Sequence, residues 1–318
     1  MSSYLTIIHA LSALHAGTGQ GSGIIDLPVA REKATGLPYL PGSSLKGALR
    51  TACPPMFEAS LRDGSKKSIQ REQIFGSEQV DVANTSAGTI QFSDQRLLLL
   101  PVRSLAGTFA WVTSPYILLR LRRDLLDLKL IQAGELLVPA VDDTKSALVI
   151  EEAEELSCKL CAHEKQIYLE DLNLVASQDP RASAWAQWLG EQIFAGEDEW
   201  QQMLRGRFCL VHDDILSFLL ETATEIVARI RLEESSKTVS QGALWYEEAL
   251  PAETILSGLG LTTPRSPADN GRRSGQEELN AEELGAAFWH IANKHLQLGG
   301  KSTVGRGQCR VRVVEGAR

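Results

Sequence analysis

The sequence has few of the features that mark secreted or membrane proteins. Its 318 residues include only five cysteines, an odd and dispersed set, so no disulfide framework is expected and a reducing compartment is the default. No apolar run approaches the roughly 20 residues that a membrane-spanning helix needs, and the first residues carry no basic signal segment. We therefore expect a cytoplasmic protein with no membrane partner.

The chain also lacks an excess of basic residues. Lys and Arg number 32 against 40 Asp and Glu, which gives a formal net charge of −8. This balance argues against a protein that binds nucleic acid through a general positive field. It leaves room for a local basic groove, because phosphate contacts depend on nearby Lys and Arg.

Several catalytic motifs are present only in part. Gly300-Lys301-Ser302 resembles the end of a phosphate-binding P-loop, but a helix is expected before this loop and none after it. Ser43-x-x-Lys46 matches one β-lactamase motif and lacks the others. Cys158 and Cys161, with His163 nearby, form at most half of a zinc site, and idle thiols are the alternative. No kinase, nucleoside-triphosphatase or zinc-finger function is expected.

Hydrophobic periodicity and turn signals predict interleaved strands and helices. Such a pattern favours an α+β fold with βαββαβ units over a doubly wound parallel sheet. The polar stretch 62–73 is expected to be a loop or an exposed helix. The expected strands cover 4–12, 88–101, 109–113, 136–141, 147–150, 166–170, 207–212, 224–232, 254–261 and 308–314. The expected helices cover 45–53, 115–130, 180–194, 197–204, 213–221 and 281–298, with Gly299 closing the last one.

Two glycine-rich stretches, near the two ends of the sequence, are the main functional signal. The first contains Gly17, Gly19, Gly21 and Gly23 and is followed by Asp26; the second covers residues 299–307. Glycine lets backbone N–H groups approach phosphates closely. The helix that follows Pro41-Gly42 would add its positive end. The alternative is a pair of glycine turns with scattered surface charges.

Several segments together resemble the RAMP superfamily of CRISPR proteins. They are Leu14-His-Ala-Gly-Thr-Gly, Ile25-Asp-Leu-Pro-Val-Ala-Arg-Glu, Leu40-Pro-Gly-Ser-Ser-Leu-Lys-Gly-Ala-Leu-Arg50 and the terminal Gly299-Gly-Lys-Ser-Thr-Val-Gly-Arg-Gly307. Residues 92–113, 223–230 and 242–248 narrow the match, because they resemble the repeated backbone subunit of the type III-B (Cmr) effector complex.

The resemblance implies a ferredoxin-like (RRM-like) βαββαβ core with insertions, in a single domain over residues 1–318. The insertions would be a helical segment over about 114–207, a projecting β-hairpin thumb over about 233–250 and a mobile loop over 262–278. A glycine-rich loop would precede the last strand.

The resemblance also implies a function. Copies of the chain would bind a guide RNA, with other Cmr subunits, and cleave complementary target RNA at regular intervals. Asp26 matches the family's catalytic aspartate and would bind a divalent metal, Mg²⁺ or Mn²⁺. The expected RNA-binding residues are Ser44, Lys46, Arg50, Lys237, Gly300, Lys301, Ser302, Thr303 and Arg306.

Two further residues are candidate helpers in catalysis. His15 and Glu225 could act as acid, base or second metal ligand; the alternatives are a packed histidine and a surface charge. Trp245-Tyr246 could stack on bases or pack on a neighbouring strand. Two other functions remain open: a non-catalytic scaffold that only binds guide RNA, and an unrelated small-molecule enzyme.

Overall fold

The computed structural model describes residues 2–19, 21, 24–76, 87–151, 157–233, 235, 239–264 and 279–315. Most of the loop expected over 262–278, and Lys237, lie outside the described residues. The strands are β1 (Ser2–Ala10), β2 (Tyr39–Leu40), β3 (Met56–Ser60), β4 (Lys66–Gln70), β5 (Ile90–Phe92), β6 (Gln95–Arg103), β7 (Phe109–Thr113), β8 (Ser146–Val149), β9 (Gln166–Leu169), β10 (Leu172–Gln178), β11 (Phe208–Val211), β12 (Glu225–Leu232), β13 (Val239–Ala249), β14 (Ile255–Thr262), β15 (His295–Gln297) and β16 (Gln308–Glu315).

The α-helices are α1 (Gly42–Ala52), α2 (Arg71–Phe75), α3 (Pro115–Asp127), α4 (Pro180–Ile193), α5 (Asp198–Arg207), α6 (Asp213–Thr222) and α7 (Ala281–Ala292); two 3-10 turns are η1 (His163–Lys165) and η3 (Ser302–Val304). No helix within the described ranges is long and apolar enough to cross a membrane.

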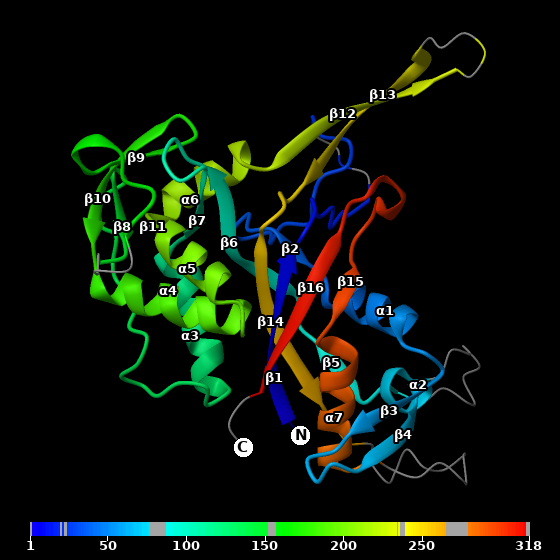
Figure 1. The fold of residues 1–318 in the computed structure, drawn as a ribbon. Coiled ribbons are helices and arrows are strands. Elements are labelled where there is room, and N and C mark those ends of the chain that lie inside the picture. Colours follow the sequence, from blue (N-terminus) through cyan, green and yellow to red (C-terminus); the bar gives the residue numbers. More distant parts are fainter. Residues whose placement is uncertain are drawn as a thin grey trace.

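One large mixed sheet runs through the molecule in the order β15-β16-β1-β14-β6-β7-β11-β8-β10-β9. Its first half is antiparallel, whereas β11 pairs with β7 and β10 with β8 in parallel. Figure 1 shows α1, α2 and α7 beside one half of the sheet and α3 to α6 beside the other. The expected α+β class is therefore confirmed.

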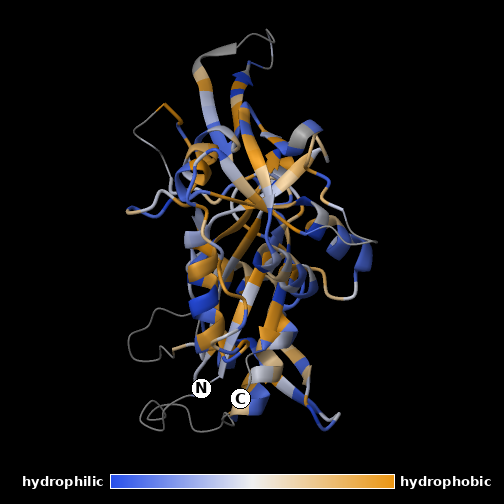
Figure 2. Ribbon diagram, turned by 90° about the vertical axis from the view of Figure 1, so that its left-hand side faces the viewer, coloured by the Kyte–Doolittle hydropathy of each residue, from blue (hydrophilic) through white to orange (hydrophobic). Residues whose placement is uncertain are grey.

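Strand β1 lies at the centre of the core, and both of its faces are covered. Tyr4 stacks on Phe288 of α7 with ring centroids 4.4 Å apart, and on the opposite face His9 meets the edge of Phe194 at 5.3 Å. Burial on both faces accounts for the mostly apolar sequence of this strand, in which every residue from Tyr4 to Ala10 is buried. Figure 2 shows hydrophobic residues along the strands in the middle of the molecule.

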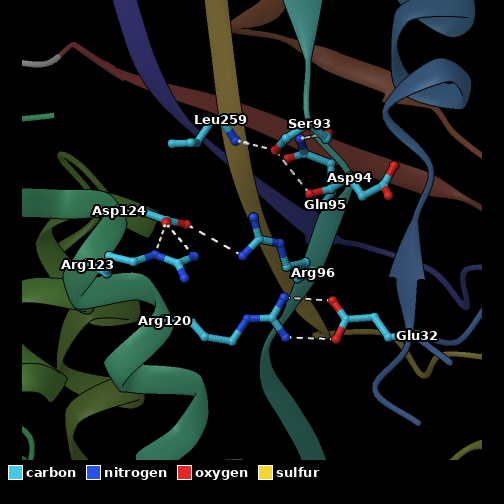
Figure 3. Close-up of polar contacts among 9 residues, drawn as sticks. All are labelled: Glu32, Ser93, Asp94, Gln95, Arg96, Arg120, Arg123, Asp124 and Leu259. Carbon is cyan, nitrogen blue, oxygen red and sulfur yellow. Dashed lines mark hydrogen bonds and ion pairs between the residues drawn. The ribbon is translucent and has the colours of Figure 1, made fainter. Parts of the chain in front are cut away.

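Ion pairs join helix α3 to the first half of the molecule (Figure 3). Arg120 donates two hydrogen bonds, of 2.8 and 2.7 Å, to the carboxylate of Glu32. The carboxylate of Asp124 lies 3.8 Å from Arg96 of β6 and 3.0 Å from Arg123. The hydrogen bonds from Arg120 lower the pKa of Glu32, although burial opposes this shift. The Arg120–Glu32 pair thus joins α3 to the turn before β2, and the Arg96–Asp124 pair joins α3 to β6.

Strands β12 and β13 form a separate two-stranded antiparallel sheet, which projects from the body in Figure 1. The expected hairpin over 233–250 therefore starts too late, because its first strand is β12. The strand expected over 224–232 is confirmed as β12; its partner, β13, was not predicted, because alternation predicts a strand but not its partner. Ile226, Ile230 and Leu244 are about half exposed on one face of this hairpin.

Three other local expectations were wrong. Residues 66–70, expected in a loop or helix, form strand β4, while the rest of 62–73 is a turn and the start of α2; residues 136–141 form no strand. The helix expected over 281–298 ends at Ala292, and β15 follows it. Gly299 is thus not the helix cap; it turns the chain after β15 with a φ of 70°.

Candidate functional site

The candidate site lies where the base of the hairpin meets the two glycine stretches. The loop that carries Asp26 joins strand β13 through the backbone. The N–H of Tyr246 donates to Oδ2 of Asp26 at 2.8 Å, and the N–H of Leu27 donates to the carbonyl of Tyr246 at 3.1 Å. Asp26 nevertheless remains exposed, so its carboxylate is anchored on one oxygen and accessible to a ligand.

His15 is buried and links three segments. Its Nδ1 lies 2.6 Å from the carbonyl oxygen of Glu248, so Nδ1 carries the proton and donates. Its own carbonyl accepts from the N–H of Gly300 at 2.9 Å. A Cβ on Gly17 would lie 2.5 Å from Nε2 of His15, and one on Gly299 would lie 2.4 Å from its carbonyl oxygen. These glycines are needed because the loops close directly around the histidine.

Glu225 is exposed at the start of β12, opposite Ala249. No hydrogen bond or ion pair described here joins it to Asp26 or to His15. His15 and Asp26 therefore contact nearby residues of β13, Glu248 and Tyr246. Glu225 lies at the foot of the hairpin, opposite Ala249.

A buried carboxylate, Glu247, collects three cations. Its Oε1 accepts from Nζ of Lys301 at 2.7 Å and from the indole N–H of Trp245 at 2.8 Å. Arg229 and Arg306 lie 3.5 and 3.7 Å from its Oε2. Burial raises the pKa of Glu247, but the hydrogen bonds from Lys301 and Trp245 outweigh it, and the pKa falls to about 2. Three cations around one anion leave this cluster net positive.

The Glu247 cluster predicts a pH-dependent contribution to stability. Because the folded pKa is lowered, the ionised carboxylate stabilises the fold above its ordinary pKa of 4.5, and this is lost as pH falls toward about 2. Glu247→Gln should lower the melting temperature most at neutral pH. The difference from the wild type should narrow below pH 4.5 in thermal unfolding scans. Glu58→Gln, which alters an exposed pair with Lys66, is the matched control; a difference at Glu247 that does not change with pH would contradict the prediction.

An open groove of about 380 Å³ runs between the two glycine stretches and helix α1. Its walls offer backbone groups and small side chains: Ala16, Gly17, Leu40, Ser44, Gly47, Ala48, Gln297, Gly299 and Gly300. Of the expected RNA-binding residues that the structure describes, only Ser44 and Gly300 line it. Ser302 and Thr303 are exposed nearby in η3. Residues 44, 47 and 48 have the i, i+3, i+4 spacing of one helix face, and this spacing could have predicted that they line the groove together.

Lys46 and Arg50 lie on the flank of α1 and bind backbone carbonyls. Lys46 donates to the carbonyl of Ile90 at 2.9 Å, and Arg50 to that of Gly76 at 3.2 Å. Burial, and then the nearby Arg50 charge, lowers the pKa of Lys46. The start of α1, which was expected to face phosphates, is occupied by the chain itself, because the N–H of Gly42 donates to Asp94 at 2.9 Å.

The donor set near Asp26 fits only one kind of metal site. Within the described ranges, no three His, Cys, Asp or Glu side chains gather closely enough to hold a metal ion. A site closed by protein ligands therefore does not fit, whereas Mg²⁺ often takes one or two carboxylates and completes its shell with water and phosphate oxygens. Cys158 and Cys161 place their sulfurs 3.5 Å apart, without a described third ligand.

The α+β sheet and its paired glycine stretches define the class. The chain belongs to the RAMP superfamily, whose family model matches residues 7–310. It is 34% identical over 316 residues to a Pyrococcus furiosus protein described as the CRISPR system Cmr endoribonuclease Cmr4, covering 99% of this chain and 97% of that protein.

Solved structures agree with this assignment. Oligomeric Cmr4 from Pyrococcus furiosus matches over 100% of both chains, with a TM-score of 0.68 and 26% identity. A chain of the type III-B Cmr-β complex bound to cognate target RNA matches over 98% of this chain and 97% of its own, with a TM-score of 0.65; at 20% identity it supports the fold alone.

Proposed function

We propose that this chain is the endoribonuclease backbone subunit of a type III-B CRISPR ribonucleoprotein. It binds guide RNA in several copies and cleaves complementary target RNA through Asp26. The observation that carries the proposal is the placement of Asp26: an exposed carboxylate, anchored on the hairpin, in a chain 34% identical to a Cmr4 endoribonuclease.

A ferredoxin-like core is part of the proposal. The strand order β16-β1-β14-β6 supports it, since in chain order these are the fourth, first, third and second strands of one βαββαβ unit. Helix α1 lies between β1 and β6 in sequence, and α7 between β14 and β16. The helical segment from α3 to α5 and the β12–β13 thumb are then insertions into this unit.

The guide RNA is proposed to follow the glycine-lined groove. The Ser44 hydroxyl, among glycines that let a phosphate approach closely, suits contacts that do not depend on base sequence. The net positive cluster of Arg229, Lys301 and Arg306 around Glu247 lies beside the groove. Lys301 directly follows Gly300, whose N–H donates to the His15 carbonyl at the groove wall. Lys46 and Arg50 would join this surface only by leaving their carbonyl partners.

The groove predicts a charge effect at Gly47. A Cβ at Gly47 meets nothing within 4 Å, so Gly47→Glu should fold and place a carboxylate in the groove. Guide-RNA affinity should fall by about tenfold or more, because one unit of charge is added beside the phosphates. Thr51→Glu adds the same charge one helical turn along, outside the groove, and serves as control in filter-binding titrations. Equal losses from both variants would show that the groove is not the RNA path.

In the proposed reaction, the 2′-hydroxyl of the target gives up its proton and its oxygen attacks the adjacent phosphorus. The bond from phosphorus to the 5′-oxygen of the next nucleotide breaks, and that oxygen leaves as a 5′-hydroxyl after taking a proton from water, so the other end is a 2′,3′-cyclic phosphate. The protein must hold the backbone in line and supply a proton acceptor or a metal ligand. The Tyr246 N–H fixes one oxygen of Asp26 and leaves the other for this role. A Mg²⁺ or Mn²⁺ ion held by Asp26 would neutralise charge on the phosphate. His15 would hold the two glycine stretches together through its bonds to Glu248 and Gly300. Glu225 would be available as a second carboxylate at the base of the hairpin.

The proposed partners are guide RNA, target RNA, further copies of this chain and other Cmr subunits. The direct test is a purified complex that carries a short RNA and receives a complementary strand with Mg²⁺ or Mn²⁺. Cuts at even intervals support the proposal. Tight target binding with no cut in either metal would instead define a non-catalytic scaffold.

A further inference from the structure

We propose that Glu248 is the residue that positions Asp26 for cleavage, acting together with Arg31. This inference rests on the proposed function of Asp26. Glu248 makes no described bond to the Asp26 carboxylate. It binds Val29 and Arg31, in the segment that follows Asp26 in the chain.

All four polar atoms of Glu248 bond to residues between His15 and Arg31, on either side of Asp26. Its N–H donates to the carbonyl of Leu27 at 3.0 Å, and its carbonyl accepts from Nδ1 of His15 at 2.6 Å. Its Oε2 accepts from the N–H of Val29 at 2.9 Å, and its Oε1 from Nη2 of Arg31 at 2.6 Å. One residue of β13 thus fixes positions both before and after Asp26 in the chain.

Burial makes this anchor stiff. The side chain of Glu248 is only 3% exposed, and Val29 is also buried. Arg31 is tied in turn to the carbonyls of Gly36 and Leu220. A buried carboxylate with two charge-assisted or backbone donors has one favourable orientation, since any rotation would leave a buried charge unpaired.

The direct contacts of Asp26 locate its oxygens but do not brace the loop that carries it. Its carbonyl accepts from the N–H of Gly21 within the same loop at 2.8 Å, and its carboxylate accepts an exposed bond from the Tyr246 N–H, which contributes little net free energy. Between this bond and the Val29–Glu248 bond the chain has only two intervening residues. Fixing Val29 therefore limits where the Asp26 carboxylate can go.

The test compares two neighbouring Arg–Glu pairs. Glu248→Gln and Arg31→Lys weaken the proposed anchor. Glu32→Gln weakens the adjacent Arg120 pair, which joins α3 and makes no described contact with β13. Each full-length variant is measured for hydrogen exchange over residues 24–31, and each assembled complex for target affinity and for single-turnover cleavage at saturating target.

Glu248→Gln should slow cleavage by about 10- to 100-fold, the range expected when a catalytic group is misplaced by about 1 Å. Target affinity should stay within about twofold, because the groove contacts are unchanged, and exchange over 24–31 should accelerate. Arg31→Lys should show the same pattern more weakly. Glu32→Gln should lower the melting temperature without changing cleavage at saturating target.

Unchanged cleavage and unchanged exchange in Glu248→Gln would overturn the inference, as would an equal cleavage loss in Glu32→Gln. If Glu248→Gln does not fold, Arg31→Lys decides by the same two readouts. Failure of the proposed function looks different: Asp26→Asn would then cleave like the wild type, while the exchange result for Glu248 still stands or falls on its own.

Discussion

Asp26→Asn should abolish target cleavage in the assembled complex and leave target binding within about twofold. The amide is isosteric and can still accept from the Tyr246 N–H, so the loop keeps its place. It carries no charge, and so it neither accepts a proton nor binds a cation well. The expected loss is about 10²- to 10⁴-fold, the usual range for a positioned acid or base. Single-turnover cleavage at saturating target measures it.

Asp63→Asn is the matched control for this substitution. Asp63 is also an exposed acid in a loop, between β3 and β4, where it accepts hydrogen bonds from Ser65. It should cleave at the wild-type rate. Cleavage by the Asp26→Asn variant at the same rate as this control would remove Asp26 from the mechanism.

Gly299→Ala should cause a large loss of stability at the second glycine stretch. Gly299 has a φ of 70°, and a Cβ there would lie 2.4 Å from the carbonyl oxygen of His15. The backbone would have to move, breaking the bond between His15 and Gly300. We expect a loss of about 3–5 kcal/mol in unfolding free energy, within the range of severe backbone substitutions, and weaker guide-RNA binding.

Gly305→Ala is the control that introduces backbone strain without a steric clash like the one between a Cβ on residue 299 and the His15 carbonyl. Gly305 has a φ of 82°, but a Cβ there meets nothing within 4 Å. It should cost only about 1–2 kcal/mol, the strain of a left-handed residue with a side chain. Denaturant titration of both variants gives the comparison. Equal losses would mean that the contact around His15 does not govern this loop.

Local signals predicted the fold where the structure depends on local chemistry. Helix α4 was expected from Asp179 followed by Pro180, and the Asp179 side chain does accept from the N–H groups of Arg181 and Ala182. Strand β7 was expected over its observed bounds, 109–113. The pairing of β12 with β13 and the early end of α7 depend on which distant segment packs against each element. Hydrophobic periodicity carries no information about that neighbour.

The same division applies to the site. Asp26, His15 and Gly300 could be selected from their motifs, and the structure places them around the base of one hairpin. Glu247 and Glu248 were missed as candidate site residues, because each binds partners that are far away in sequence. The directions of Lys46 and Arg50 could not be predicted either, since a helical wheel gives a face and not its neighbours.

The central claim is that each copy of this chain makes one cut with its own Asp26. Complexes assembled from mixtures of wild-type chain and Asp26→Asn variant test it most directly, with the products of an end-labelled target mapped at nucleotide resolution after a single turnover. The account predicts evenly spaced cuts whose positions never change and whose rate at each position falls in proportion to the variant fraction. Cuts that persist in full with the variant alone would contradict it.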